Sequence, residues 1–269
     1  MQKLLLLMCA LASFFTTAVE LSFAFVPQQS AAKLARNWQP IIDYINAHTG
    51  DHYVFKTAKD IPTFESRVLA GEYDIAYMNP YHFVVFNEHA GYQAIAKQKD
   101  KRIKGIIVVA KDAGISQLEQ LQDNVIAFPA PAAFAASILT RAELSARGVA
   151  FQPRYVSSHD SVYLNVAKGF AAAGGGVMRT FNNTDAAVRD QLRVLWTSEG
   201  FTPHAFAAKS TVPESTKARL LAALLSLNDS EQGKALLQAV NFNGISPATN
   251  EDWSDVKSLG IDTLIGINH

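Results

Sequence analysis

The chain has 269 residues, of which 49% are apolar and 18% charged, and its 24 basic side chains equal its 24 acidic ones in number. This composition is typical of a globular protein with one large or two medium-sized domains and excludes an intrinsically disordered chain. The formal net charge of zero gives no support for nucleic acid or an anionic membrane surface as a partner.

The first 18 residues are predicted to form a signal peptide that directs the chain to the periplasm. Lys3 precedes an apolar run from Leu4 to Phe15, which is too short to span a bilayer, and Ala18 provides a small residue for cleavage. A first buried helix is the alternative, but the next run, ELSFAFV, already has the pattern of a strand. The only cysteine, Cys9, lies in this segment, so the exported chain would contain no disulfide.

From residue 21 onward, apolar strand-like runs alternate with helical patterns. Short apolar runs separated by helices favour α/β architecture with mainly parallel sheets. A polar break at residues 97–102 divides the runs into two series. Strands are expected at 21–26, 52–58, 74–78 and 92–97 in the first series, and at 103–111, 124–128, 152–156, 171–177, 193–198 and 204–209 in the second.

The helical regions between and after these strands complete the expected organisation. The helix that follows Ser30 contains Pro40, which predicts a kink or a division into two short helices. A long helix is expected over residues 132–147, and from Pro213 the pattern is purely helical. Two series joined by two connections predict two lobes with a hinge, and such a fold binds its ligand in the crevice between the lobes.

The stretch YDIAYMNPYHF, residues 73–83, places polar groups where a predicted strand ends and a helix begins. Tyr77, Asn79 and Tyr81 would lie at the carboxyl end of the strand, which is the crevice side of an open α/β sheet. Free amides at a helix start attract anions, and each tyrosine offers a ring and a hydroxyl to a ligand. Packing of both tyrosines in the core is the alternative.

The loop FPAPAAF, residues 128–134, ends another predicted strand and opens the long helix. The amides of Ala132, Ala133 and Phe134 form a second candidate helix start for binding an anion. Phe128 and Phe134 are candidates for an apolar wall of the crevice, and core packing explains each of them equally well. The loop contains no serine or threonine and does not match a nucleotide-binding P-loop.

Two further segments carry candidate polar contacts. In VSSHDSV, Ser157 and Asp160 have the spacing of a capping box, and His159 would donate to a ligand oxygen from the first helical turn. In AAAGGGVMRTF, the glycines permit a close approach of another backbone or a ligand, and Arg179 is a candidate clamp for an oxyanion. A capping histidine and a surface arginine are the alternatives.

Catalytic and metal-binding patterns are not found in the sequence. It lacks H-E-x-x-H, G-x-S-x-G and G-x-G-x-x-G, and its seven histidines are scattered. His48 and His52 are four residues apart, but Gly50 between them ends the helix that would place them on one face. We therefore expect a binding crevice without catalytic residues, metal ions or cofactors.

Three stretches resemble the phosphate/phosphite/phosphonate-type substrate-binding proteins of ABC importers, which have the class II periplasmic binding protein fold. The stretches are ELSFAFVPQQSAAKLARNWQPIIDYINAHTG, GEYDIAYMNPYHF and SSHDSVYLNVAKGFAAAGGG, and their order and spacing match over essentially the whole chain after the signal. The resemblance implies a first lobe of residues 19–104 plus 205–269 and a second lobe of residues 105–204. It also implies that Tyr77, Asn79, Tyr81, the helix start at 131–134 and His159 face the ligand.

The resemblance implies an exported, monomeric protein that captures a small oxyanion or organic anion of the phosphonate-like class and presents it to the permease of an ABC importer. The alternatives are a sensor that presents its ligand to a membrane histidine kinase and, opposed by the missing catalytic pattern, an enzyme of the same fold. The chain departs from phosphonate-binding members at PAPAAF, where they carry hydroxyl side chains, and at VMRTF, where they often carry an acidic residue.

Overall fold

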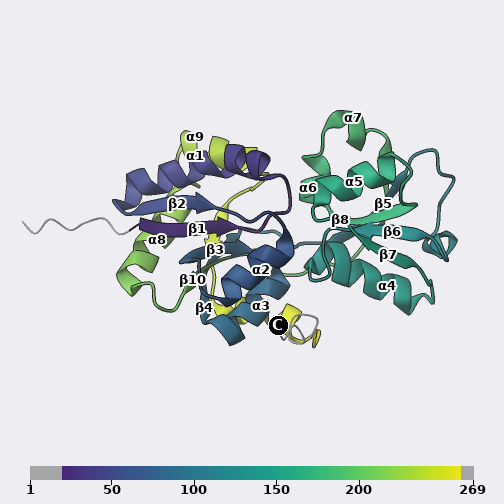
Figure 1. Cartoon of the computed structure of the whole chain (residues 1–269). Coiled ribbons are helices and arrows are strands. Elements are labelled where there is room, and N and C mark those ends of the chain that lie inside the picture. The colour runs from purple at the N-terminus through teal and green to yellow at the C-terminus, as the bar shows by residue number, and fades with distance from the viewer. Residues whose placement is uncertain (1–19, 262–269) are drawn as a thin grey trace, which may run out of the picture.

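The structure, a computed structural model, describes residues 20–261 and consists of two lobes, each built on a β-sheet with helices packed on it (Figure 1). The two-lobe α/β fold expected from the sequence is confirmed. Each of the expected strands begins and ends within two residues of its predicted position. The predicted signal peptide, residues 1–18, lies outside the described residues.

The first lobe is built on six strands. They are β1 (Glu20–Phe25), β2 (His52–Lys56), β3 (Ile75–Met78), β4 (Tyr92–Gln98), β10 (Ala205–Lys209) and β11 (Ile245–Pro247), in the spatial order β11-β4-β10-β3-β1-β2. The helices of this lobe are α1 (Ala31–Thr49), α2 (Ile61–Leu69), α3 (Pro80–Ala90), α8 (Glu214–Ser226), α9 (Glu231–Ala239), the 3-10 turn η3 (Asn250–Trp253) and α10 (Ser254–Lys257).

The second lobe is built on five strands. They are β5 (Gly105–Ala110), β6 (Val125–Phe128), β7 (Gln152–Tyr155), β8 (Ala173–Val177) and β9 (Leu192–Thr197), in the spatial order β7-β6-β8-β5-β9. Its helical elements are the 3-10 turn η1 (Leu118–Leu121), the π-helical turn η2 (Phe134–Leu139), α4 (Thr140–Ala146), α5 (His159–Ala167), α6 (Met178–Asn182) and α7 (Ala186–Arg189).

The alternation of side chains along β1 shows why the first sheet is covered on both faces. Phe23 and Phe25 belong to a buried cluster with Trp38 of α1 and Leu224 of α8. Ala24 points the other way, into the cluster formed by α2 and α3. Successive residues of a strand face opposite sides of a sheet, so a continuous apolar run is buried only between two layers of helices.

Strand direction places the ends of many strands at the crevice. In the first sheet β1 to β4 run in one direction, and β10, between β3 and β4, runs in the other. In the second sheet β6 to β9 share one direction and β5 is reversed. The start of each reversed strand therefore meets the carboxyl end of a neighbour, with Ala205 opposite Met78 and Gly105 opposite Val177.

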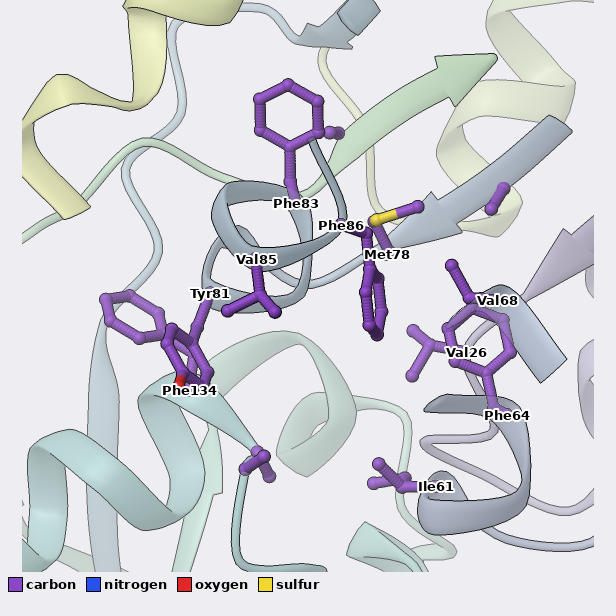
Figure 2. Packing of buried hydrophobic residues seen from close by; sticks show 14 of the residues in the cluster. Val26, Ile61, Phe64, Val68, Met78, Tyr81, Phe83, Val85, Phe86 and Phe134 are labelled. Atoms are coloured by element: carbon purple, nitrogen blue, oxygen red, sulfur yellow. The ribbon is translucent and has the colours of Figure 1, made fainter. Parts of the chain in front are cut away.

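One buried cluster extends from the first lobe into the second. Figure 2 shows Phe134, at the start of η2, in the same packed group as Tyr81 and Val85 of α3. The group also contains Ile103 and Phe201, which lie on the two segments that connect the lobes and form an isolated antiparallel bridge. Burial of this shared apolar surface stabilises the arrangement in which the lobes are in contact.

Three local expectations are wrong. The region after Pro213 is not purely helical, because Ile245–Pro247 form β11, which pairs antiparallel with β4. α1 is a single helix that continues through Pro40, whose exposed position leaves the unpaired carbonyl of the preceding turn open to water. The N-cap of α5 is Ser158, whose hydroxyl accepts a hydrogen bond from the amide of Ser161 at 3.1 Å. Ser157, the expected cap, instead has a left-handed backbone with a φ of 69°, so the cap lies one residue later and its partner is Ser161, not Asp160.

Candidate ligand-binding site

A cavity of about 340 Å³ lies in the crevice and is lined by residues of both lobes. Tyr77 at the end of β3 and His204 just before β10 line it from the first lobe, and Arg179 of α6 lines it from the second. Its size is at the lower end of the range for small-molecule sites. The strand ends thus form a pocket where the alternating pattern of strands and helices predicted a crevice.

A second, smaller cavity of about 10 Å³ is also lined by both lobes. A space of this size accommodates about one water molecule. No aspartate or glutamate side chain lines it. Its polar lining residues are Gln28, Asn79, His159 and His204, and the others are Val26, Ile61, Ile103, Ala133, Phe134, Ala135, Ala136 and Val177.

The second lobe presents the start of a helix to this small cavity. The helix expected from residue 132 begins as the π-helical turn η2 at Phe134 and continues as α4. Its N-cap residue, Ala133, provides no side-chain hydrogen bond. Since the first amides of a helix have no acceptor within the helix, those of Phe134, Ala135 and Ala136 are available at the cavity that these residues line.

Two glycines allow this turn to lie directly on the second sheet. A Cβ atom on Gly175 of β8 would come closer than 3.0 Å to the carbonyl oxygen of Ala136, and one on Gly105 of β5 would do the same to that of Ala135. Any larger residue would push the backbone of η2 away from the sheet. The glycine-rich strand therefore serves the close approach of another backbone, one of the two roles predicted for it.

His159 is the most deeply buried polar side chain at the small cavity. It is the first residue of α5 and only 1% exposed. Its Nδ1 lies 3.1 Å from the hydroxyl of Thr180, which lies 2.8 Å from that of Tyr163. Its Nε2 is buried and has no hydrogen-bond partner among residues 20–261. Burial first, and then the positive charge of Arg179, lower the pKa of His159 to about 3.

The neighbours of His159 decide what its free nitrogen can do. Because the imidazole is neutral, only one of its two nitrogens carries a proton. The carbonyl of Val177 is a second acceptor for both hydroxyls, at 3.2 Å from that of Tyr163 and 3.0 Å from that of Thr180. When Thr180 donates to Nδ1 instead, the proton of His159 lies on Nε2. In this tautomer His159 is a hydrogen-bond donor to any anion in the small cavity.

Gln28 contacts three residues at the crevice, namely His204 in its own lobe and Arg179 and His159 in the other. Its side-chain nitrogen lies 3.0 Å from Nε2 of His204, and its side-chain oxygen accepts a hydrogen bond from Nη2 of Arg179. Its carbonyl oxygen accepts one from the amide of His159 at 2.9 Å. The amide nitrogen can only donate, so Nε2 of His204 accepts. Burial, and then the charge of Arg179, keep the pKa of His204 well below its usual value.

The structure places Tyr77 and Arg179 together with His204. The guanidinium carbon of Arg179 lies 6.0 Å from the centre of the Tyr77 ring, within the range of a cation–π contact. The ring of Tyr77 stacks on that of His204 with centroids 5.1 Å apart. Burial raises the pKa of Tyr77, against the opposing effect of Arg179. All three side chains line the larger cavity.

Asn79 is a second link between the lobes. Its side-chain oxygen accepts a hydrogen bond from the amide of His82 at 2.8 Å and thereby caps α3. Its side-chain nitrogen donates to the carbonyl of Ala132 in the other lobe at 3.2 Å. Asn79, Ala133 and Phe134 line the small cavity. Ala132 does not line it, but its carbonyl accepts the hydrogen bond from Asn79.

Tyr81 and Phe128 lie away from both cavities. Tyr81 is buried in the cluster of α2 and α3 (Figure 2) and lines a separate groove beside α10. Phe128 packs inside the second lobe against Phe151 and Tyr155, with ring centroids 5.9 and 6.2 Å apart. For these two residues the structure shows the core-packing role that the sequence analysis kept as an alternative.

Contacts outside the cavities also join the lobes. Lys33 of α1 donates a hydrogen bond to the carbonyl of Asn183 and lies 3.7 Å from the carboxylate of Asp160. The side-chain nitrogen of Asn241 donates to the side-chain oxygen of Asn183. Gln29 donates to Asp160 at 3.4 Å. These polar contacts also hold the lobes in a closed arrangement.

Gln28 and His204 are site residues that the sequence analysis did not single out. Gln28 follows the end of β1 by three residues, and like Asn79 after β3 it lies where a parallel strand ends at the crevice. His204 precedes β10, and the start of a strand lies at this edge only because β10 is reversed. No local sequence pattern shows that reversal.

Two classes of feature are not observed in the described part of the chain. Within residues 20–261, no group of three or more His, Cys, Asp or Glu side chains is arranged to hold a metal ion. In the same residues no helix is both long and apolar enough to cross a membrane.

Comparison with known proteins places the chain in a family. Residues 23–253 match the family model described as the phosphonate periplasmic substrate-binding protein of ABC transporters. The phosphate-import protein PhnD of Mycolicibacterium smegmatis is 22% identical over 214 residues, which are 71% of this chain and 67% of that protein.

Solved structures of the same kind share the fold. PhnD1 from Prochlorococcus marinus, solved with methylphosphonate, has a TM-score of 0.81 and 16% identity over 90% of this chain and 97% of that one. A binding protein of an ABC phosphonate transporter from Pseudomonas aeruginosa has a TM-score of 0.83 and 14% identity over 91% and 86% of the two chains. The family model, which covers most of the chain, describes substrate-binding proteins and not enzymes. The chain therefore belongs to the family of periplasmic phosphonate substrate-binding proteins of ABC transporters.

Proposed function

We propose that this chain captures a small tetrahedral oxyanion of the phosphonate class between its lobes and delivers it to the permease of an ABC importer. The observation that carries this proposal is Nε2 of His159, a buried nitrogen without a partner among the described residues, at a cavity that also meets the start of η2. A buried donor left without an acceptor is costly, so such a group indicates a missing partner.

The donors at the small cavity suit an oxyanion. The amides of Phe134, Ala135 and Ala136 offer backbone donors at the positive end of a helix, and His159 offers a side-chain donor from the opposite element. A carboxylate would repel an anion there, and none lines the cavity. The loop PAPAAF lacks hydroxyl groups, so its backbone amides are the hydrogen-bond donors that it offers to an oxyanion.

The size of the small cavity implies that binding involves opening. With the lobes closed it holds about one water molecule, which is less than a phosphonate group needs. Asn79 and Gln28 bond across the crevice directly to the second lobe. We infer that the lobes part to admit the anion and reclose with these contacts rearranged around it, which is the hinge closure of two-lobed binding proteins.

The location and partner follow from the same assignment. We propose that residues 1–18 direct export to the periplasm, where a monomeric chain meets its permease. A fusion of residues 1–30 to a reporter that is active only after export tests the signal, with Lys3→Glu as a variant expected to reduce export. Cytoplasmic retention of the wild-type fusion would overturn this part of the proposal.

The decisive experiment measures binding by calorimetry with methylphosphonate, phosphite, phosphate and sulfate. We expect at least one phosphorus oxyanion to bind with a Kd in the micromolar range or below, and His159→Ala to weaken it by at least about tenfold. His52→Ala, an exposed histidine on β2, is the matched control and should bind like the wild type. Absence of binding to every phosphorus oxyanion, or equal affinity in His159→Ala, would refute the proposal.

A further inference from the structure

We propose that the larger cavity of the crevice holds a second anionic group of the ligand, so that the preferred ligand is an oxyanion with an anionic substituent. This inference rests on the proposed function, because the first anionic group is the one placed in the small cavity. The observation that carries it is Arg179, a half-buried cation that faces the larger cavity and has no carboxylate partner within residues 20–261.

The two cavities are adjacent. Ile103, Val177 and His204 line both of them, so a molecule held in the small cavity can extend past these side chains into the larger one. The larger cavity, at about 340 Å³, has room for a substituent of several heavy atoms, which a bare phosphite or methylphosphonate would leave unfilled.

All the charged side chains that line the larger cavity are positive. Four cationic residues line it and no aspartate or glutamate does. Arg102 already forms an ion pair with Asp255 at 2.7 Å, so its charge is compensated. Lys101 and Lys104 are exposed and form no ion pair with the described residues. The local field in the cavity therefore favours an anion and disfavours a cation.

Arg179 is the specific recognition group. Among the described residues its guanidinium makes one hydrogen bond, through Nη2 to the neutral side-chain oxygen of Gln28. A guanidinium has five N–H groups in a planar fork that fits a carboxylate or a phosphoryl group with two parallel hydrogen bonds. Its remaining donors are not used by a protein acceptor, and a half-buried cation without a counter-charge is costly.

A different role for Arg179 would be purely mechanical. Its bond to Gln28 joins the two lobes, so it could stabilise closure without touching the ligand. The two roles predict different results. A lobe contact favours every ligand to the same extent, whereas a recognition group favours only those ligands that carry a second anion.

The test compares phosphonates with a chain of three carbon atoms that differ in the charge at the end away from the phosphonate group. The probes are 3-phosphonopropionate, propane-1,3-bisphosphonate, propylphosphonate and 3-aminopropylphosphonate, with methylphosphonate as the minimal ligand, each titrated calorimetrically into the purified protein. Two of the probes, 3-phosphonopropionate and propane-1,3-bisphosphonate, carry two anionic groups and are called the dianionic probes. We expect one of them to bind at least about tenfold more tightly than propylphosphonate, and 3-aminopropylphosphonate to bind more weakly than propylphosphonate. The better dianionic probe identifies the second group as a carboxylate or a phosphoryl group.

Substitutions at Arg179 then separate the roles through the ratio of two affinities. Arg179→Met should reduce the preference for the dianionic probe over propylphosphonate to less than about threefold, and Arg179→Lys should retain part of it because the charge remains. Arg154→Met is the matched control: Arg154 lies on β7 of the same lobe, is exposed and lines neither cavity. The control should keep the wild-type ratio.

The outcomes that overturn the inference differ from those that overturn the proposed function. If methylphosphonate binds but the dianionic probes show no preference, the inference fails and the proposed function stands. The inference also fails if Arg179→Met weakens all the probes by the same factor, because that result assigns Arg179 to lobe closure alone. If no probe and no methylphosphonate binds but phosphite or phosphate does, the inference alone fails. If no phosphorus oxyanion binds at all, the proposed function fails and the inference with it.

Discussion

The amide of His159 donates a hydrogen bond to the carbonyl oxygen of Gln28 at 2.9 Å, and this contact joins the first turn of α5 in one lobe to the segment after β1 in the other. The imidazole of His159 and the side-chain amide of Gln28 consequently reach the same small cavity only when the lobes are together. Closure and assembly of the site are therefore one event.

Removal of the Gln28 side chain is expected to weaken ligand binding. Gln28→Ala leaves Arg179 and His204 without their hydrogen-bond partner while the backbone contact to His159 remains. We expect the Kd for methylphosphonate to rise by about tenfold, mainly through faster dissociation. Calorimetry and stopped-flow fluorescence measure both quantities.

The control for this substitution is Gln39→Ala. Gln39 is exposed on α1 and bonds only to Asp43 of the same helix, so its removal should leave both rates unchanged. An unchanged dissociation rate in Gln28→Ala would contradict the role of Gln28 in closing the site.

Lys33 is expected to influence the balance between open and closed forms. Its ammonium group contacts the carbonyl of Asn183 and lies 3.7 Å from Asp160, and both partners are in the other lobe. Partly exposed ion pairs contribute up to about 1 kcal/mol. Lys33→Met should therefore raise the radius of gyration of the ligand-free protein in small-angle scattering and raise Kd by up to about fivefold.

A lysine outside the crevice gives the comparison. Lys56 is exposed at the end of β2 and forms no ion pair with the second lobe among residues 20–261, so Lys56→Met should scatter and bind like the wild type. Equal scattering curves for all three proteins, with and without ligand, would show that Lys33 does not hold the lobes.

Much of the fold could be predicted from the sequence because the signals for it are local. The apolar run of β1, the turn residues around it and the helices between the strands each report on their own segment. Strand order is a long-range property, however, and the insertion of β10 between β3 and β4 leaves no local trace. His204 was missed for this reason, since its place at the site depends on the direction of β10.

The outcome for the predicted site residues depends on which face of an element each side chain occupies. Tyr77, Asn79, His159 and Arg179 line the two cavities, whereas Tyr81 is turned into the core of the first lobe. Both tyrosines lie beside the same strand end, Tyr77 within β3 and Tyr81 in the first turn of α3, so both were predicted to face the ligand. The backbone turns at Asn79, the N-cap of α3, so the side chains of Tyr77 and Tyr81 point to different parts of the lobe. This turn cannot be predicted from the residue types alone.

The spacing between η2 and the second sheet is expected to control binding. Gly175→Ala would place a Cβ atom closer than 3.0 Å to the carbonyl oxygen of Ala136, so the start of η2 must move. We expect loss of stability by about 1–3 kcal/mol together with at least about tenfold weaker binding of methylphosphonate. Urea unfolding and calorimetry on the same preparation report the two effects.

Gly169→Ala separates a stability effect from a site effect. Gly169 has a φ of 71° and no atom near its missing Cβ, so alanine there costs about 1–2 kcal/mol through backbone strain alone. This variant should lose stability and keep its affinity. Wild-type affinity in Gly175→Ala would show that the position of η2 is not critical for the ligand.

The stability of the ligand-free protein is expected to fall on acidification because of His159. Its pKa is lowered to about 3 in the folded state by burial and by Arg179, whereas the unfolded chain has the ordinary value near 6.5. Between these values the unfolded state binds a proton that the folded state does not, so stability rises with pH in this window and is lost as the pH decreases.

Between pH 6.5 and 5.0 this single group is expected to lower the free energy of unfolding by about 1.6 kcal/mol. His159→Gln removes the group, so urea unfolding of this variant should show a smaller pH dependence by about that amount, whatever its stability at pH 6.5. His52→Gln, at an exposed position on β2, should retain the full pH dependence of the wild type. The same pH dependence in His159→Gln and the wild type would mean that His159 already exchanges protons with solvent in the folded protein, and then a neutral donor at Nε2 would not describe the site.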